Sequence, residues 1–289
     1  MSHWDPALCA LREASNGIYG PRSFADYLRE IGADPNHHRS ATLSVDTRSQ
    51  LPDRLAEADA MVLQLGRAAD APGPRFALVH VPDRLDDFFL DERAFPPDDR
   101  ETLDYTPDGE DAPTLGRAAR DVLDVHRSLP TYSERGFVHL ALSTGLLSRA
   151  LDLDAPADLA PPTAASSFDF AFDPHPDRPT TLRYTGGHLE LDAVVPARRN
   201  GERVLLAVAA NCGGRVELAK HAVGYPALAA ATLSVGVDRV VPVSLRARPT
   251  RGGVRYSVYE WSALPDEGER QPCLAGFEVV GDSQYELRL

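Results

Sequence analysis

The spacing of apolar residues in the first third of the chain predicts a small unit of helix and strand. In residues 23–32, apolar side chains recur at three- and four-residue intervals, and Ser23 stands where a helix N-cap is expected. Two largely apolar runs, residues 58–68 and 74–82, have the length and composition of buried strands. We therefore expect an N-terminal α+β unit.

Helical spacing also occurs in the middle of the chain, and strand patterns dominate after residue 168. The predicted helices lie at 115–129, 134–151 and 216–234, and the predicted strands at 168–172, 188–196, 202–210, 238–245 and 254–261. Asn200-Gly201 favours a tight antiparallel hairpin, whereas a long helix between strands allows a parallel crossover. We predict an α/β (α+β) fold with a mixed sheet flanked by helices.

Two stretches rich in Pro, Asp and Ala interrupt these patterns at residues 95–114 and 153–167. Such segments are typical of linkers or long surface connections. We expect an N-terminal α+β domain of unknown role over residues 1–110. A second domain would cover 111–289, including its leading helices.

Composition limits the protein class. A chain of 289 residues with 43% apolar content can bury a substantial core. Neither a membrane-spanning apolar run nor a basic-then-apolar leader is recognisable, so we expect a soluble, cytoplasmic protein. The three cysteines, Cys9, Cys212 and Cys273, are widely separated and do not predict a disulfide framework or a zinc site.

The charge pattern is unusual in two respects. The net charge is −13, and Lys220 is the single lysine among 30 basic residues. This composition looks like that of a halophile protein, because dense carboxylates keep a chain hydrated where molar salt screens charges. The acidity then reflects the solvent, and only local basic patches would indicate a nucleic-acid partner.

The predicted strand at 188–196 carries two carboxylates on one face. Strand alternation places Glu190 and Asp192 on the same side, where carboxylate oxygens form a candidate site for a divalent cation. The alternative is a half-exposed strand of an acidic protein. Composition alone favours this alternative.

The order of helix, hairpin, helix and strand over residues 130–262 resembles the PD-(D/E)XK nuclease superfamily, which has the restriction-endonuclease-like fold. Asp192 stands at the position of the family's hairpin Asp. Residues 208–211, Val-Ala-Ala-Asn, stand where relatives have Glu-x-Lys-Asn, and residues 221–229 are similar to the helix that follows.

This resemblance implies a chemistry that the chain lacks in part. In these nucleases the Asp and Glu hold Mg²⁺, and the Lys orients the attacking water. Val208 and Ala210, expected on the strand face that the Glu and Lys would occupy, can do neither. The resemblance therefore implies a nuclease-fold protein with degenerate catalysis, which would use Mg²⁺ only if it were active.

A displaced active site is the sharper alternative, because some members of the superfamily carry the missing group on the helix after the hairpin. Glu217, Lys220 and His221 are spaced to share one helical face. This alternative predicts catalytic Asp192, Glu217 and Lys220, with Asp192, Glu190 and Glu134 as metal ligands. A solvated helix face, with Glu134 merely stabilising a helix N-terminus, explains the same residues.

Nucleic-acid binding is a further hypothesis. The arginines near the hairpin are candidate phosphate contacts for DNA: Arg198, Arg199, Arg203 and Arg215. They equally fit a role in balancing an acidic surface. The rival class is a non-catalytic structural or interaction protein, for which a protein partner or a homodimer is expected instead of DNA. No membrane partner is expected.

Overall fold

The computed structural model of the chain describes residues 2–34, 40–67, 73–95, 100–129, 133–155, 164–214, 216–233, 236–264 and 271–289. It is a mixed α/β structure with two main sheets, which confirms the predicted class. Within these residues, none of the helices has the length and apolar character needed to cross a bilayer.

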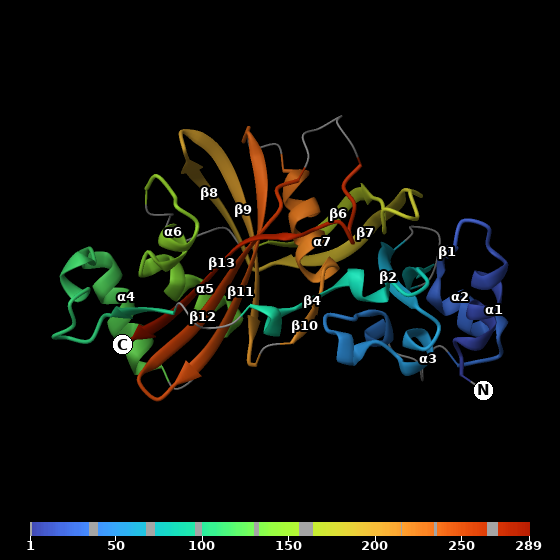
Figure 1. The fold of residues 1–289 in the computed structure, drawn as a ribbon, viewed down its shortest axis with the longest axis horizontal. Coiled ribbons are helices and arrows are strands. Elements are labelled where there is room, and N and C mark those ends of the chain that lie inside the picture. Colours follow the sequence, from blue (N-terminus) through green and yellow to red (C-terminus); the bar gives the residue numbers. More distant parts are fainter. Residues whose placement is uncertain are drawn as a thin grey trace.

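A five-stranded sheet lies at the N-terminal end of the molecule (Figure 1). Its strand order is β1-β3-β2-β7-β6, with β1 Ile18–Ser23, β2 Ala60–Arg67, β3 Pro74–His80, β6 Ala164–Phe172 and β7 Leu182–Leu191. The helices beside it are α1 Asp5–Glu13, α2 Phe24–Glu30 and the short α3 Asp53–Ala56. The expected cap is present, since Ser23 Oγ accepts a hydrogen bond from the backbone N–H of Asp26 at 3.3 Å.

A six-stranded mixed sheet forms the second part. Its order is β5-β13-β12-β11-β9-β8, with β5 Glu101–Asp104, β8 Ala193–Arg199, β9 Glu202–Cys212, β11 Arg239–Thr250, β12 Gly253–Trp261 and β13 Val279–Arg288. β8 and β9 form the predicted antiparallel hairpin, and β9 runs parallel to β11. The crossover between β9 and β11 contains α7 His221–Ala231, as a parallel connection requires.

Helices cover both faces of this sheet (Figure 1). On one face lie α4 Arg117–Ser128, α5 Glu134–Ser143 and α6 Leu146–Ala150, and on the other lies α7. The helix expected over 134–151 is broken at Gly145, whose φ of 71° is left-handed. Val204, Leu206 and Val208 of β9 point to the α4–α6 layer, whereas Leu205 and Ala207 point to the α7 layer.

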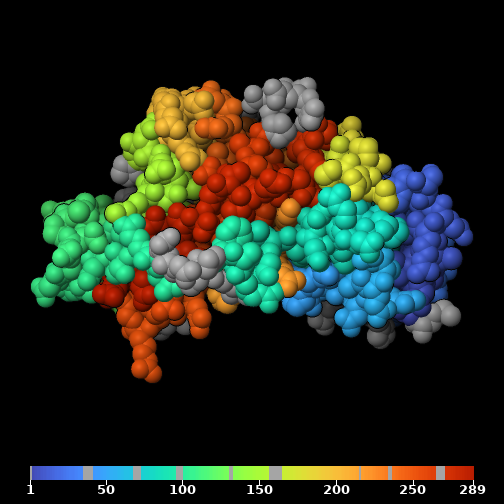
Figure 2. All heavy atoms as spheres, in the orientation of Figure 1, coloured from blue at the N-terminus to red at the C-terminus, as the bar shows by residue number. Residues whose placement is uncertain are grey.

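The division expected at residue 110 does not follow the sheets. β5 precedes that position but pairs with β13 of the six-stranded sheet, while β6 and β7 follow it but belong to the five-stranded sheet. A two-stranded ladder of β4 Phe89–Asp91 and β10 Glu217–Ala219 also joins the two halves of the sequence. Figure 2 shows the teal region of β4 on the surface between the blue N-terminal part and the red C-terminal strand.

The turn between β8 and β9 provides a test of local backbone strain. Asn200 has φ 52° and Gly201 has φ 81°, both in the left-handed region that a two-residue hairpin turn requires. We expect Gly201→Ala to lower the free energy of unfolding by about 1–2 kcal/mol in a denaturant titration, because a Cβ disfavours this backbone conformation.

Gly252→Ala is the matched control. An added Cβ would meet no atom within 4 Å at either glycine, and Gly252 does not have a left-handed φ. Equal losses at the two positions would show that backbone conformation is not the cause.

Candidate functional site

Asp192 lies where the chain passes from one sheet to the other. β7 ends at Leu191 and β8 begins at Ala193, so the single strand expected over 188–196 is two strands separated by a bend. The half-buried Asp192 accepts a hydrogen bond at Oδ2 from the backbone N–H of Ala210, at 2.8 Å. Burial raises the pKa of the Asp192 carboxyl, and this hydrogen bond opposes the rise.

The register of the hairpin determines which residues face Asp192. Ala193 pairs with Val208, which places Ala209 opposite the bend, and directly opposed residues share a face. Val208 is buried in the α4–α6 layer, and Ala210 packs against that layer. Val208 therefore points into the α4–α6 layer. Ala210 nevertheless lies beside Asp192, because its backbone N–H donates to that carboxylate.

A cavity of about 460 Å³ opens beside Asp192, at the later halves of the parallel strands β9 and β11. The carboxyl ends of parallel strands are a common place for ligand sites in α/β proteins. The predicted residues Glu134, Glu190 and Asp192 all line this cavity. Its other polar lining residues are Ser44, Asp46, Gln64, Glu92, Tyr184, His188, Asn211, His221, Tyr225, Ser244 and Arg246.

Three of the carboxylates in this cavity have raised pKa values. Burial is the largest cause for Asp46, Glu134 and Asp192, and the charge of Asp192 further raises the pKa of Glu134. Within the described residues none of the three has an ion-pair partner. Glu190 differs, because it lies 3.3 Å from the guanidinium of Arg135.

A buried ion pair of Glu92 and Arg246 forms part of the cavity wall. Arg246 Nε lies 2.6 Å from Glu92 Oε2, and the two side chains are 5% and 1% exposed. The same Glu92 oxygen accepts a hydrogen bond from the backbone N–H of Val216 at 2.9 Å. Sequence reasoning missed this pair. The available signal was a charged residue within the apolar run of β11.

His221 and Tyr225, one turn apart on α7, also line the cavity. Burial lowers the pKa of His221 to about 4, so its imidazole is neutral near pH 7. Burial raises the pKa of Tyr225 well above 10, so its hydroxyl also stays neutral. In the described part of the chain, neither His221 Nδ1 nor the Tyr225 hydroxyl has a hydrogen-bond partner.

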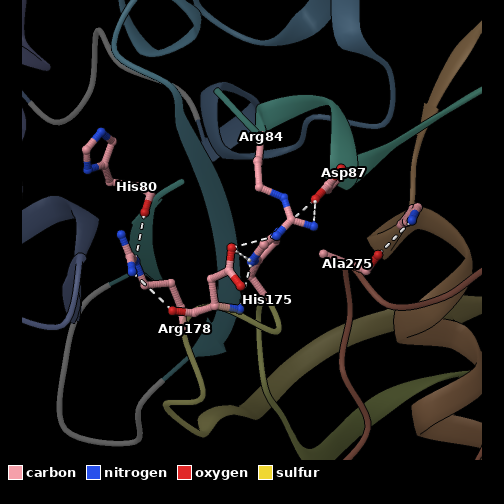
Figure 3. A network of polar contacts seen from close by, with 8 residues as sticks. His80, Arg84, Asp87, His175, Arg178 and Ala275 are labelled. Carbon is pink, nitrogen blue, oxygen red and sulfur yellow. Dashed lines mark hydrogen bonds and ion pairs between the residues drawn. The ribbon is translucent and has the colours of Figure 1, made fainter. Parts of the chain in front are cut away.

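Glu217 and Lys220 are not brought to this cavity. Glu217 is in β10 and not in a helix, because residues 217–219 are held extended by pairing with β4, and its carboxylate forms an ion pair with Arg93. Lys220 precedes α7, and its Nζ donates to the carbonyl oxygen of Ala275 at 2.7 Å (Figure 3). Among the described residues that line the cavity, neither Glu217 nor Lys220 is present.

A second polar network surrounds His175 (Figure 3), and its residues do not line the cavity. The fully buried His175 accepts a hydrogen bond at Nδ1 from the backbone N–H of Asp177, so its Nε2 carries the proton and donates to Asp87 at 3.0 Å. Arg84 bridges Asp87 and Asp177. These contacts fix the loop after β6 against the segment after β3, which is a structural role.

Three of the candidate DNA-binding arginines, Arg198, Arg199 and Arg203, lie around the hairpin turn, at the opposite end of β9 from Asp192. Arg199 forms an ion pair with Glu260 at 2.5 Å, and Arg198 donates to the carbonyl of Gly201 at 3.2 Å. Arg203 lies on β9 just after the turn, and Arg215 lies outside the described residues. The described arginines therefore do not form a phosphate-binding wall for the cavity.

The nuclease resemblance implies a magnesium site. Only some of its ligands are present here. Glu134 and Asp192 offer the carboxylate oxygens that Mg²⁺ prefers. However, the described residues contain no group of three or more His, Cys, Asp or Glu side chains arranged to hold a metal ion. The second hairpin strand has no carboxylate at residues 208–211, so the ligand pair that the family places on the hairpin is incomplete.

Comparison with protein-family models and with curated proteins gives no match to this chain.

Proposed function

We propose that this chain is a nuclease-fold protein that does not hydrolyse phosphodiesters, and that its cleft binds a ligand instead. The order of α5, the β8–β9 hairpin, α7 and the parallel strand β11 supports a relationship to the PD-(D/E)XK superfamily. One observation carries the loss of catalysis: the β9 residues that line the cavity with Asp192 are Ala209, Ala210 and Asn211, and none of them carries a charge.

The chemistry explains why this observation matters. Hydrolysis requires stabilisation of the charge that develops on phosphorus oxygens and an activated water. A methyl group and a neutral amide provide neither. The amine and carboxylate of the displaced-site alternative, Lys220 and Glu217, are bonded to Ala275 and Arg93, which disfavours that alternative.

The charge of the cavity also disfavours DNA as its ligand. Among the described residues, five carboxylates line it, at positions 46, 92, 134, 190 and 192, against the single arginine Arg246, which Glu92 already neutralises. A phosphate would be repelled by such a wall. A binding protein without a nucleic-acid role in this cleft fits these residues best.

A nuclease assay tests the proposal. The purified protein is incubated with linear and supercoiled DNA in high salt with Mg²⁺ or Mn²⁺, beside the Asp192→Ala variant. We expect both proteins to leave the DNA intact, at the level of a sample without protein. Metal-dependent cleavage by the wild type that Asp192→Ala abolishes would refute the proposal.

A further inference from the structure

We infer that the cavity beside Asp192 binds a small organic cation, an amine or guanidine that also carries a carbonyl or hydroxyl oxygen on a short apolar body. This inference rests on the proposed binding role of the cleft and adds the chemical class of the ligand. Three independent features of the cavity lead to it.

The first feature is a group of carboxylates without ion pairs. Asp46, Glu134 and Asp192 line one cavity and have no ion-pair partner within the described residues. Asp192 is half-buried, whereas Asp46 and Glu134 are exposed. Glu134 lies close enough to the other two to feel both negative charges, which the nearby Arg246 opposes. Three carboxylates around one cavity attract a positive charge, and the half-buried Asp192 gains most from it because removing a carboxylate from water is costly.

The second feature is the size and spread of the site. In the described residues these carboxylates do not converge as the ligand set of a metal ion. The cavity of about 460 Å³ is far larger than one ion needs, and it falls within the usual range of about 300–1,000 Å³ for small-molecule pockets. Leu43, Leu218, Val223 and Tyr184 supply apolar walls. A cation with an organic body matches both the spread of charge and these walls.

The third feature is a set of polar atoms without partners. Arg246, His221 and Tyr225 line the cavity with only 4%, 8% and 4% of their surface exposed. Within the described residues Arg246 Nη2, His221 Nδ1 and the Tyr225 hydroxyl make no hydrogen bond. Buried polar atoms rarely lack a hydrogen-bond partner. Because Arg246 Nη2 can only donate, the ligand needs an oxygen acceptor in addition to its positive charge.

Calorimetric titration with a matched pair of probes tests the inference. Nα-acetyl-arginine amide carries a guanidinium and amide oxygens, whereas Nα-acetyl-citrulline amide replaces the guanidinium with a neutral urea of nearly the same shape. The titration uses a KCl concentration at which circular dichroism shows a folded protein. Salt screens charges in a partly buried pocket less than charges at the surface. We expect one-to-one binding of the arginine probe and at least tenfold weaker binding of the citrulline probe.

Two variants locate the binding. Asp192→Asn and Asp46→Asn remove a charge with little change of shape, and each should weaken the arginine probe at least tenfold, while both proteins keep the wild-type dichroism spectrum. Glu57→Gln is the control, because Glu57 is an exposed carboxylate paired with Arg54 outside the cavity, and it should bind like the wild type.

Three results would overturn the inference: no heat with the arginine probe, equal affinity for the two probes, or unchanged binding by both Asn variants. The nuclease assay remains a separate measurement. DNA cleavage would refute the proposed function whatever the titration gives, whereas absence of probe binding in a protein that leaves DNA intact would refute the ligand class alone.

Discussion

Replacing Glu92 with Gln is expected to lower the free energy of unfolding by about 3–5 kcal/mol, because removing one partner of a buried ion pair leaves the other charge uncompensated. The side chains of Glu92 and Arg246 are almost fully buried, and Glu92 also accepts a hydrogen bond from the backbone N–H of Val216. Both interactions weaken in the variant. Urea titration at constant KCl concentration, followed by circular dichroism, measures the loss.

Two further variants of the chain serve as references for the stability loss measured in Glu92→Gln. Glu57→Gln breaks an exposed pair with Arg54, whose atoms lie 3.3 Å apart, and should cost less than about 1 kcal/mol. The double variant Glu92→Gln/Arg246→Met removes both buried charges and should regain most of the stability lost by the single variant. A loss at Glu92 no larger than that at Glu57 would contradict the assigned role of the pair.

Acid should destabilise the protein partly through His221. Its pKa is lowered from 6.5 to about 4 by burial, so between these pH values the unfolded chain binds a proton that the folded protein does not. The contribution of His221 to stability is therefore complete above pH 6.5 and is lost as the pH falls toward 4. The shift corresponds to at most about 3 kcal/mol.

The comparison of wild type with His221→Gln isolates this contribution from the many carboxylates that titrate in the same range. Urea titrations at several pH values between 7 and 4 should show a steeper loss of stability in the wild type, by about 3 kcal/mol over the range. His188→Gln, at an exposed position, should follow the wild type. Parallel profiles for wild type and His221→Gln would show that the imidazole is not buried in its neutral form.

Local patterns in the sequence predicted the elements whose stability is itself local. The helix after Ser23, the strands β2 and β3, the helix α4 and the β8–β9 hairpin all follow from apolar spacing, capping or turn residues. The segment 217–219 was predicted as helix and is a strand, because pairing with β4 overrides the local preference. Nothing local indicates that pairing.

The sequence also predicted part of the candidate site. Asp192, Glu190 and Glu134 were expected near one another and do line one cavity. The bend at Asp192 separates β7 from β8, and alternation along a single continuous strand could not anticipate that bend. Glu92 lies in an acidic stretch where no local feature distinguishes it, since its partners Val216 and Arg246 are more than a hundred residues further along the chain.

The interleaving of the two sheets constrains how the protein matures on the ribosome. β6 and β7, two of the five strands in the N-terminal sheet, are translated only after β5 and the helices α4 to α6 of the other sheet. The N-terminal region therefore cannot complete its sheet until Leu191 has left the exit tunnel, although domains commonly fold in the order of synthesis. Until β7 arrives, the edge of β2 that it covers has no strand partner, and an unpaired strand edge is prone to aggregation.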